Sequence, residues 1–381
     1  MLAGAPRVLV VYPGPIFSTK DVADNAVAGL EANGCAVLPF LYHEFLSLAS
    51  MLEERFPEEQ KPDMLANLSL FAADRAVVQA LLFRPDLVLV ISGTVFPLAT
   101  AALISQYTQT AVWLTESPYQ YAQEAGIQQW YRTVFTNERQ SVEPFKVQRR
   151  SVEHQAAERV YHLPHAYDPA RHYPIDIVPD DYRSDVCFIG SPFPERKALL
   201  GGVNWDGIHF AAHAVFGNQD EHPFIEAPQG NVPNAEAQRW YAGAKININH
   251  HRTITFYGTD EHIDVDAGAA DSLNPRVFEL AAGRCFQICD DTRAELGEVF
   301  GDSIPTYRHD DPADLERVIR YYLARPDERE RLAAEAYARV QAHTAQARMR
   351  VVLERTIGLP QSVAGTLETQ EESDGCRSQA A

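Results

Sequence analysis

One pattern restricts the fold of this 381-residue chain more than any other feature. Short runs of consecutive apolar residues alternate with stretches of helical periodicity, and the alternation occurs twice. In the first half the runs include 7–11, 87–91 and 111–114. Strands that are apolar on both faces are typical of parallel sheets with helices on both sides. The first half therefore predicts one Rossmann-like domain.

The same alternation starts again after a segment rich in Pro, Asp and His. Predicted strands at 185–189, 207–211, 245–248 and 284–289 are interleaved with predicted helices. We therefore expect an α/β protein in which two Rossmann-like domains face a central cleft, with ligands at the carboxyl ends of the strands. The predicted division is an N-terminal acceptor-side domain (1–165), a linker (166–183), a C-terminal domain (184–345), a C-terminal helix (346–360) and a disordered acidic tail (361–381).

Composition narrows the class of partner and the compartment. The net charge of −19, from 33 basic and 52 acidic residues, disfavours a long nucleic acid as partner. No apolar run approaches the ~18 residues of a membrane helix, and the start of the chain has no signal-peptide pattern. Five scattered cysteines do not suggest a disulfide framework. We expect a cytoplasmic protein without integral membrane contact.

The segment 272–283 carries the strongest local signal for a binding site. Asn274 is the predicted N-cap of a helix that begins at Pro275, so the first turn, which includes Val277, would point free N–H groups into the cleft. Arg276 adds a cation suited to a phosphate, and Glu279, one turn further, can accept hydrogen bonds from a diol such as a ribose. The alternative is a plain capped helix with a surface Arg–Glu pair.

Three segments together resemble a known family. The segments 274–283 (Asn-Pro-Arg-Val-Phe-Glu, then Ala-Gly), 163–169 (Leu-Pro-His-Ala-Tyr-Asp-Pro) and 188–197 resemble GT-B glycosyltransferases of the group related to the CgeB spore-maturation proteins. The resemblance runs in order over about residues 110 to 345. It implies the GT-B fold, with a C-terminal domain like that of glycosyltransferase family 1 that binds a nucleotide-sugar.

The resemblance also implies roles for residues of the C-terminal half. Glu279 would bind the donor ribose, and Arg276 would face the diphosphate or the sugar. Arg196 and Lys197 would neutralise the leaving diphosphate, although a solvated helix start explains these two residues equally well. The remaining predicted donor-binding residues border the same site: Gly190 and Ser191 in the loop after the first strand of this half, and Asn249 at the end of a later strand.

Two residues are candidates for catalysis. Glu116 follows the strand 111–114, and the related group often has an acidic residue there, so Glu116 is the candidate general base for an acceptor hydroxyl. The alternative is a carboxylate that supports the next helix. His165 lies in the loop expected to face the cleft and would contact donor phosphate or sugar; a structural histidine of the linker is the alternative.

We expect no metal and no cofactor besides the donor substrate. His250 and His251 are adjacent in a strand and point to opposite faces, and no Asp or Glu at ligand spacing supports them. Cys285 and Cys289 read as small core residues, because no His or Cys cluster near them would complete a zinc site. No Gly-x-Gly-x-x-Gly follows the first strand, which weakens a dehydrogenase interpretation.

The sequence therefore predicts a metal-independent transferase of a hexosyl or related group, which moves a sugar from a nucleotide-diphosphate sugar to an unidentified acceptor. Candidate acceptors are a glycan precursor, a protein, a small molecule or a modified nucleobase. Two alternatives remain open: a non-catalytic nucleotide-sugar-binding module, and a GT-B-like nucleotide-sugar epimerase.

Overall fold

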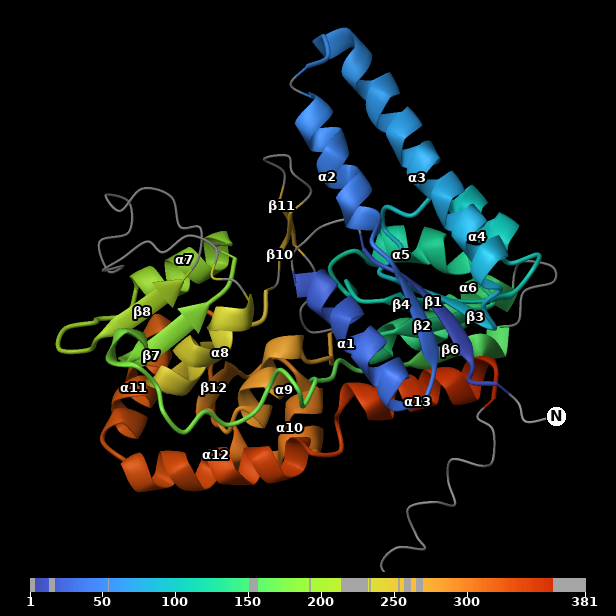
Figure 1. The fold of residues 1–381 in the computed structure, drawn as a ribbon. Coiled ribbons are helices and arrows are strands. Elements are labelled where there is room, and N and C mark those ends of the chain that lie inside the picture. The colour runs from blue at the N-terminus through green and yellow to red at the C-terminus, as the bar shows by residue number, and fades with distance from the viewer. Residues whose placement is uncertain are drawn as a thin grey trace, which may run out of the picture.

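A computed structural model describes residues 4–13, 18–53, 55–150, 157–191, 193–213, 232, 234–252, 254–256, 262–264 and 270–358. They form two lobes, each built on its own parallel sheet (Figure 1). The N-terminal sheet has the order β2-β1-β3-β4-β5-β6, so the chain reverses its direction of travel between β1 and β3. Its strands are β1 (Arg7–Val11), β2 (Ala36–Phe40), β3 (Leu87–Ile91), β4 (Gln109–Leu114), β5 (Thr133–Thr136) and β6 (Val160–His162).

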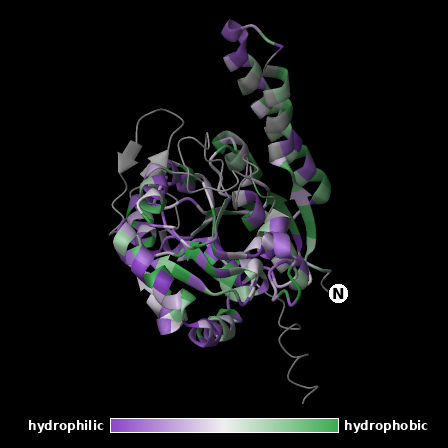
Figure 2. Ribbon diagram, turned by 90° about the vertical axis from the view of Figure 1, so that its left-hand side faces the viewer, coloured by the Kyte–Doolittle hydropathy of each residue, from purple (hydrophilic) through white to green (hydrophobic). Residues whose placement is uncertain are grey.

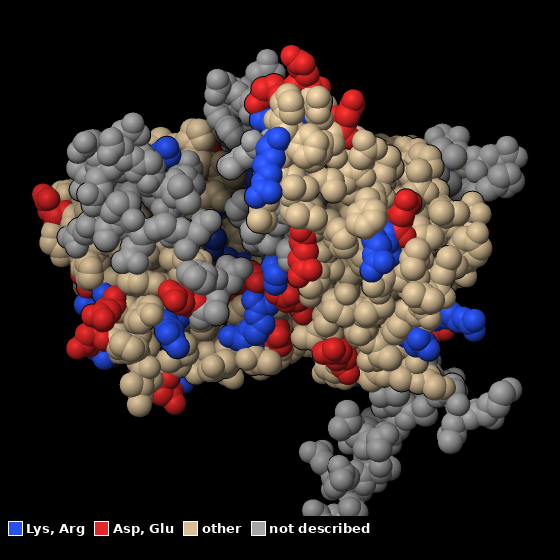
Figure 3. Space-filling model, turned by 45° about the horizontal axis from the view of Figure 1, so that its top comes forward, with Lys and Arg blue, Asp and Glu red and all other residues tan. Residues whose placement is uncertain are grey.

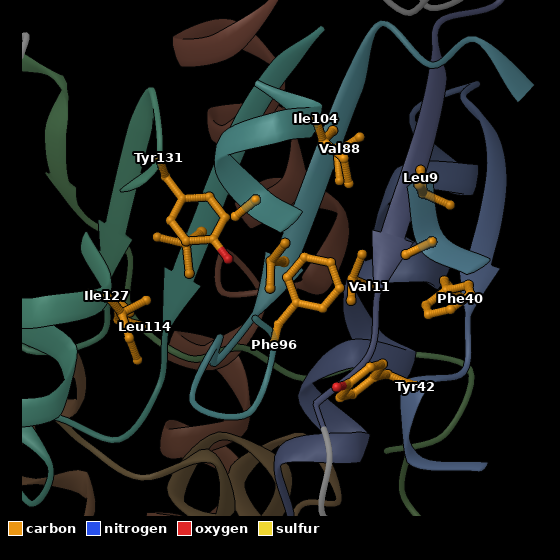
Figure 4. Close-up of a cluster of buried hydrophobic side chains, with 14 of the residues drawn as sticks. Leu9, Val11, Phe40, Tyr42, Val88, Phe96, Ile104, Leu114, Ile127 and Tyr131 are labelled. Atoms are coloured by element: carbon orange, nitrogen blue, oxygen red, sulfur yellow. The ribbon is translucent and has the colours of Figure 1, made fainter. Parts of the chain in front are cut away.

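Both faces of this sheet are covered by helices, as the continuous apolar strands require. Val8 and Val10 of β1 face α1, whereas Leu9 and Val11 face the opposite core, which Figure 4 shows. That second core also takes in α3 to α6. The helices of this half are α1 (Ser18–Ala32), α2 (Tyr42–Glu53), α3 (Lys61–Phe83), α4 (Leu98–Ile104), α5 (Tyr121–Ile127) and α6 (Val142–Arg150), with 3-10 turns at Glu58–Gln60, Gln128–Trp130, Arg139–Ser141 and Ala157–Arg159.

The antiparallel pair α2 and α3 projects from the body of the N-terminal lobe (Figures 1 and 2). The segment Glu58–Phe83 is long and apolar enough to cross a membrane, by length and composition only. This finding corrects the expectation from the sequence that no segment approaches that length. Only 18% of its most apolar window is buried inside the molecule, so most of this surface lies outside any core.

The C-terminal sheet has the order β13-β12-β9-β7-β8, and all its neighbouring strands are parallel. Its order reverses between β7 and β9, which is where sheets of this kind bind ligands. A separate antiparallel hairpin joins β10 to β11. The strands are β7 (Ser184–Ile189), β8 (Phe210–His213), β9 (Ala244–Asn249), β10 (Ile254–Phe256), β11 (His262–Asp264), β12 (Gln287–Asp290) and β13 (Thr306–Tyr307).

Helices cover the two faces of this sheet as well. One core joins the sheet to α7, α11 and α12, and clusters on the other side pack it against α8, α9 and α10. The helices are α7 (Pro194–Gly201), α8 (Asn234–Gly243), α9 (Pro275–Ala282), α10 (Ala294–Phe300), α11 (Pro312–Leu323) and α12 (Pro326–Val340), with 3-10 turns at Asp180–Tyr182 and Gly301–Ser303.

The last helix of the described residues, α13 (Ala345–Thr356), returns to the N-terminal lobe and packs on α1. Met349, Val352 and Leu353 belong to the core beneath α1. The two stretches of chain that pass between the lobes touch each other, since Tyr167 and Thr344 form a parallel β-bridge. Both crossings therefore lie side by side at one point of the molecule.

The predicted α/β architecture of two parallel sheets is confirmed, with small differences at the ends of strands. The predicted strand 284–289 begins only at Gln287, because Arg284 adopts a positive φ of 53° in a turn. The predicted strand 207–211 begins at Phe210, because Gly207 has a φ of 75°. The predicted disordered tail 361–381 lies outside the described residues.

Candidate active site

The predicted donor-binding residues meet at the reversal point of the C-terminal sheet. Gly190 directly follows β7, and a Cβ atom there would lie 3.2 Å from Arg196 Nη1 and 3.3 Å from Arg276 Nη2. The missing side chain leaves room for two guanidinium groups beside the end of the strand. Phe188 lies beneath both of them, with its ring centre 5.7 Å from Arg196 Cζ and 6.0 Å from Arg276 Cζ.

Arg196, in the first turn of α7, is a buried cation. Its Nη1 donates to the carbonyl of Ser191 (3.1 Å), and its Nη2 donates to the carbonyl of His250 (2.7 Å). Burial, together with the charges of Arg276 and Arg252, lowers the pKa of Arg196 to about 10. A buried cation with further cations beside it creates a place where an anion is stabilised. Lys197 is the next residue of the same helix and is half-buried.

Helix α9 begins as the sequence predicts. The Asn274 side chain accepts a hydrogen bond from Val277 N (3.2 Å), so Asn274 is the N-cap. The same side chain donates to Asn249 Oδ1 (2.9 Å), which ties the helix start to the end of β9. Because the cap uses the Val277 N–H, this amide is not a free donor for a ligand, contrary to the expectation for Val277.

Arg276 and Glu279 point to different neighbours. Arg276 Nε donates to the Tyr241 hydroxyl (3.2 Å). Glu279 Oε1 lies 3.9 Å from His172 Nε2, a residue of the interdomain connection. Within the described residues the two side chains do not pair with each other, so the alternative of a surface Arg–Glu pair does not describe this helix.

A buried aspartate supports the loop before α9. Asp290 Oδ2 accepts hydrogen bonds from His251 N (2.6 Å) and His251 Nδ1 (2.9 Å). His251 Nε2 in turn accepts the Asn274 N–H (3.3 Å). Burial would raise the pKa of Asp290, but the adjacent His251 outweighs it and holds the pKa well below the usual value. The carboxylate is therefore ionised. His251 bridges it to Asn274 and so helps to position the N-cap.

The sequence argument that no acidic residue supports these histidines is wrong. Asp290 lies within ligand distance of His250 and His309 in one group, and of His251 and Cys289 in another. The rings of His250 and His309 are stacked, with centres 4.4 Å apart and planes 8° apart. Two parallel imidazoles do not aim their nitrogens at one ion, which disfavours a metal in the group that contains His250 and His309. The absence of a metal stays a prediction for the group of His251, Cys289 and Asp290.

Glu116 lies in the N-terminal lobe and reaches the segment after β9 in the C-terminal lobe. Its carboxylate accepts a hydrogen bond from Arg252 Nη2 (3.0 Å), which follows β9 in the other lobe. Burial raises the pKa of Glu116, and the charge of Arg252 opposes this effect. The loop of Glu116 is itself held by Glu124, which accepts the N–H of Glu116 (2.9 Å) and the hydroxyl of Ser117.

Aromatic rings lie between the partner of Glu116, Arg252, and the buried Arg196. Arg252 lies over the ring of Tyr119, 4.1 Å from its centre, and 5.3 Å from the ring centre of Phe193. Phe193 also lies next to Arg196, whose Cζ is 5.2 Å from the ring centre. Glu116 and the arginines therefore form one chain of contacts between the lobes. Figure 3 shows basic and acidic side chains along the hollow between the two lobes.

His165 is placed elsewhere. It packs against Trp113, with ring centres 6.0 Å apart, beside a cavity of about 10 Å³ between α1, β4 and α13. Burial lowers its pKa to about 3, so the imidazole is neutral. A catalytic role for His165 remains a prediction, and these surroundings favour the structural alternative.

Comparisons with known proteins match the part of the chain that contains the predicted donor-binding residues. Residues 190–354 match the family model described as glycosyl transferase-like. The spore protein CgeB of Bacillus subtilis is 27% identical over 166 residues, which cover 41% of this chain and 48% of CgeB. Residues 190–354 are therefore similar to glycosyl transferase-like domains, and part of the chain is similar to CgeB. The match spans about half the length of that relative.

Solved structures extend the likeness to both lobes. Sucrose-phosphate synthase from Thermosynechococcus elongatus gives a TM-score of 0.60 at 12% identity, over 91% of this chain and 97% of the other. HepE from Anabaena, solved in complex with UDP and glucose, gives 0.57 at 13% identity, over 92% and 98%. The protein therefore has the GT-B fold, as the sequence resemblance implied.

The C-terminal lobe is also held against the N-terminal lobe by residues that the sequence did not single out. The buried carboxylate of Glu138, after β5, accepts hydrogen bonds from the backbone N–H groups of Asp271 and Ser272 (3.2 Å each). Arg139 adds ion pairs to Asp271 (3.0 Å) and Glu298 (2.7 Å). These contacts hold the loop that leads into α9.

Two further residues of the site were missed as well. Arg293, in the C-terminal lobe, donates to the Tyr119 hydroxyl of the N-terminal lobe (3.0 Å). Neither Arg293 nor Tyr119 belongs to a motif, because their pairing depends on how the two lobes face each other. Arg252 comes three residues after Asn249, which was predicted to border the donor site, and its pairing with Glu116 could not be predicted from the sequence.

Proposed function

We propose that the protein is a glycosyltransferase that transfers a sugar from a nucleoside-diphosphate sugar to an acceptor hydroxyl. The proposal is supported by the cationic cluster of Arg196, Arg276 and Arg252 at the reversal point of the C-terminal sheet. Three neighbouring guanidinium groups beside a capped helix start suit a diphosphate, whose charge grows as the bond to the sugar breaks. The GT-B relatives solved with UDP support a nucleotide as the donor part.

In the proposed reaction, the bond between the anomeric carbon and the diphosphate oxygen breaks, and the electron pair leaves with the diphosphate. The acceptor oxygen forms the new bond to the anomeric carbon and gives its proton to Glu116. Burial already raises the pKa of Glu116, which favours its use as a base. When the donor binds, Arg252 would release its ion pair with Glu116 and bind the diphosphate instead. No metal is required, because the guanidinium groups supply the positive charge.

The donor assignment is tested by binding of UDP and a panel of UDP-sugars to the full chain. Arg276→Ala and Glu279→Ala should each weaken binding about 10- to 100-fold, as expected for lost charge-assisted hydrogen bonds. Asn274→Asp keeps the capping oxygen, loses the hydrogen bond donated to Asn249 and adds a negative charge, so the affinity for the donor should fall. Arg284→Ala removes a partly exposed arginine of the same lobe that pairs with Glu330 and serves as control.

Unchanged affinity in both Arg276→Ala and Glu279→Ala would remove the site assignment. Product formed from donor alone, without any acceptor, would favour the epimerase. Binding without turnover in the presence of candidate acceptors would favour the non-catalytic module. Activity that EDTA abolishes, and a divalent ion restores, would contradict the proposed metal independence and point to the histidine and aspartate cluster near Asp290.

A further inference from the structure

The outer face of α3 presents apolar side chains without a cover in the described molecule. Leu70, Phe71, Val78, Leu81 and Leu82 are 45–79% exposed. The opposite face of the same helix is buried and carries small residues, among them Ala72, Ala76 and Ala80. Large apolar side chains therefore face solvent at positions where a surface helix usually has polar residues. Such a surface is typical of an interaction site. The helix belongs to the hairpin that projects from the body (Figure 2).

The spacing on this face matches a helix that packs along another helix. Asn67, Phe71, Asp74, Val78 and Leu81 follow one another at intervals of four, three, four and three residues. This period of 3.5 keeps one seam facing a partner helix over several turns. Asp74 stands in the middle of the apolar seam, with Arg75 at its edge, and both are exposed.

The charges in the seam select the partner and its direction. We propose that the protein forms a two-fold symmetric dimer in which the α3 helices of two copies pack antiparallel through this seam. Two-fold symmetry centred between positions 74 and 75 places Asp74 of each copy beside Arg75 of the other. The same register places Phe71 beside Val78. The two Asp74 side chains also lie close to each other across this axis, and each has Arg75 of the other copy beside it. In a parallel pair the like charges, Asp74 with Asp74 and Arg75 with Arg75, lie level with each other.

The ends of the hairpin agree with an antiparallel arrangement. The tip carries the exposed acidic residues Glu58, Glu59 and Asp63. An antiparallel partner brings this tip to the other end of α3, where Arg84 is exposed. The acidic tip, together with Asp74 and Arg75 in the middle of the helix, disfavours a membrane as the cover of this surface.

A charge-complementation experiment tests the dimer. Asp74→Arg and Arg75→Asp, each studied alone, place like charges at both contacts of the symmetric pair, and each should raise the dimer dissociation constant at least about ten-fold. When the two variants are mixed, every contact pairs an arginine with an aspartate. The mixture should therefore recover dimers of mixed composition, measured by sedimentation equilibrium with one variant carrying a fluorescent label.

Leu81→Ser should weaken the dimer by a similar factor, whereas Val147→Ser, at an exposed apolar residue of α6, should not. A wild-type chain that stays monomeric at all concentrations would overturn the proposal. So would a dimer that Asp74→Arg and Leu81→Ser leave unchanged, or two weakened variants that do not recover on mixing. Binding of wild-type monomers to phosphatidylcholine–phosphatidylglycerol vesicles would assign the surface to a membrane instead.

Discussion

Buried carboxylates hold the loops of the candidate site in place. Glu124 binds the loop of Glu116, Glu138 binds the loop before α9, and Glu295 accepts the N–H of Leu273 (2.8 Å) in that same loop. Each carboxylate accepts backbone N–H groups that would otherwise be left without partners in a dry environment. None of the three needs to touch substrate, because each acts on the position of residues that face the hollow.

Glu124 should make the stability of the protein depend on pH. Burial raises its pKa from 4.5 to about 8, so near pH 6 the folded state keeps a proton that the unfolded chain releases. Stability is therefore present in acid and falls as the pH rises through 8, by about 2 kcal/mol between pH 6 and 8 for this group. Glu124→Gln mimics the protonated form and should remove that part of the loss, measured by urea unfolding at both pH values. A variant with the wild-type pH profile would contradict this account.

Sequence reasoning worked at the residue scale where the signal is local. Asn274 and Pro275 are adjacent, so the capped helix start could be predicted from a few residues. Arg252 and Glu116 are 136 residues apart, and their pairing depends on two lobes facing each other. The same holds for Asp290 and His251, which belong to different strands, and this is why the acidic partner of the histidines was missed.

The helices were predicted from periodicity and their packing partners were not. The predicted C-terminal helix exists as α13, but nothing in its sequence indicates that it packs on α1, more than 300 residues earlier. Gly29 shows how close the two helices approach. A Cβ atom at position 29 would lie 2.4 Å from the carbonyl oxygen of Ala345, which is backbone and cannot rotate away.

Gly29→Ala should therefore destabilise the protein although alanine is the better helix former. The overlap with α13 forces the two helices apart, at a cost of about 1–3 kcal/mol in the free energy of unfolding. Gly126→Ala, in α5, is the matched control, because a Cβ there meets nothing within 4 Å. That control should be neutral or more stable by up to about 1 kcal/mol. Equal stability of both variants in urea unfolding would show that the α1–α13 contact is looser than described.

At the scale of the whole molecule, the relative position of the lobes depends on a few polar contacts. Tyr167 and Thr344 join the two chain crossings, and Glu138 and Arg139 reach from β5 to the loop before α9. On the other side of the hollow, Arg252 and Arg293 reach Glu116 and Tyr119. The candidate site is therefore complete only when the two lobes keep this relative position.

Glu138→Gln should weaken the contact between the two lobes. Its amide NH₂ would face a backbone N–H that the carboxylate now accepts, and the loss should be about 1–3 kcal/mol. Scanning calorimetry should show the two lobes melting further apart in temperature, and UDP affinity should fall. Glu143→Gln, which removes only an exposed pair with Lys146, should change neither. A single unshifted transition in Glu138→Gln would show that this carboxylate does not couple the lobes.

The return of α13 to the first lobe has a consequence for biosynthesis. Met349, Val352 and Leu353 complete a core that otherwise consists of residues from the first 163 positions. While the ribosome is still translating the second lobe, the first lobe has an apolar face open to solvent. That face can close only when α13 has emerged, so the core of the first lobe is completed after the second lobe has been synthesised.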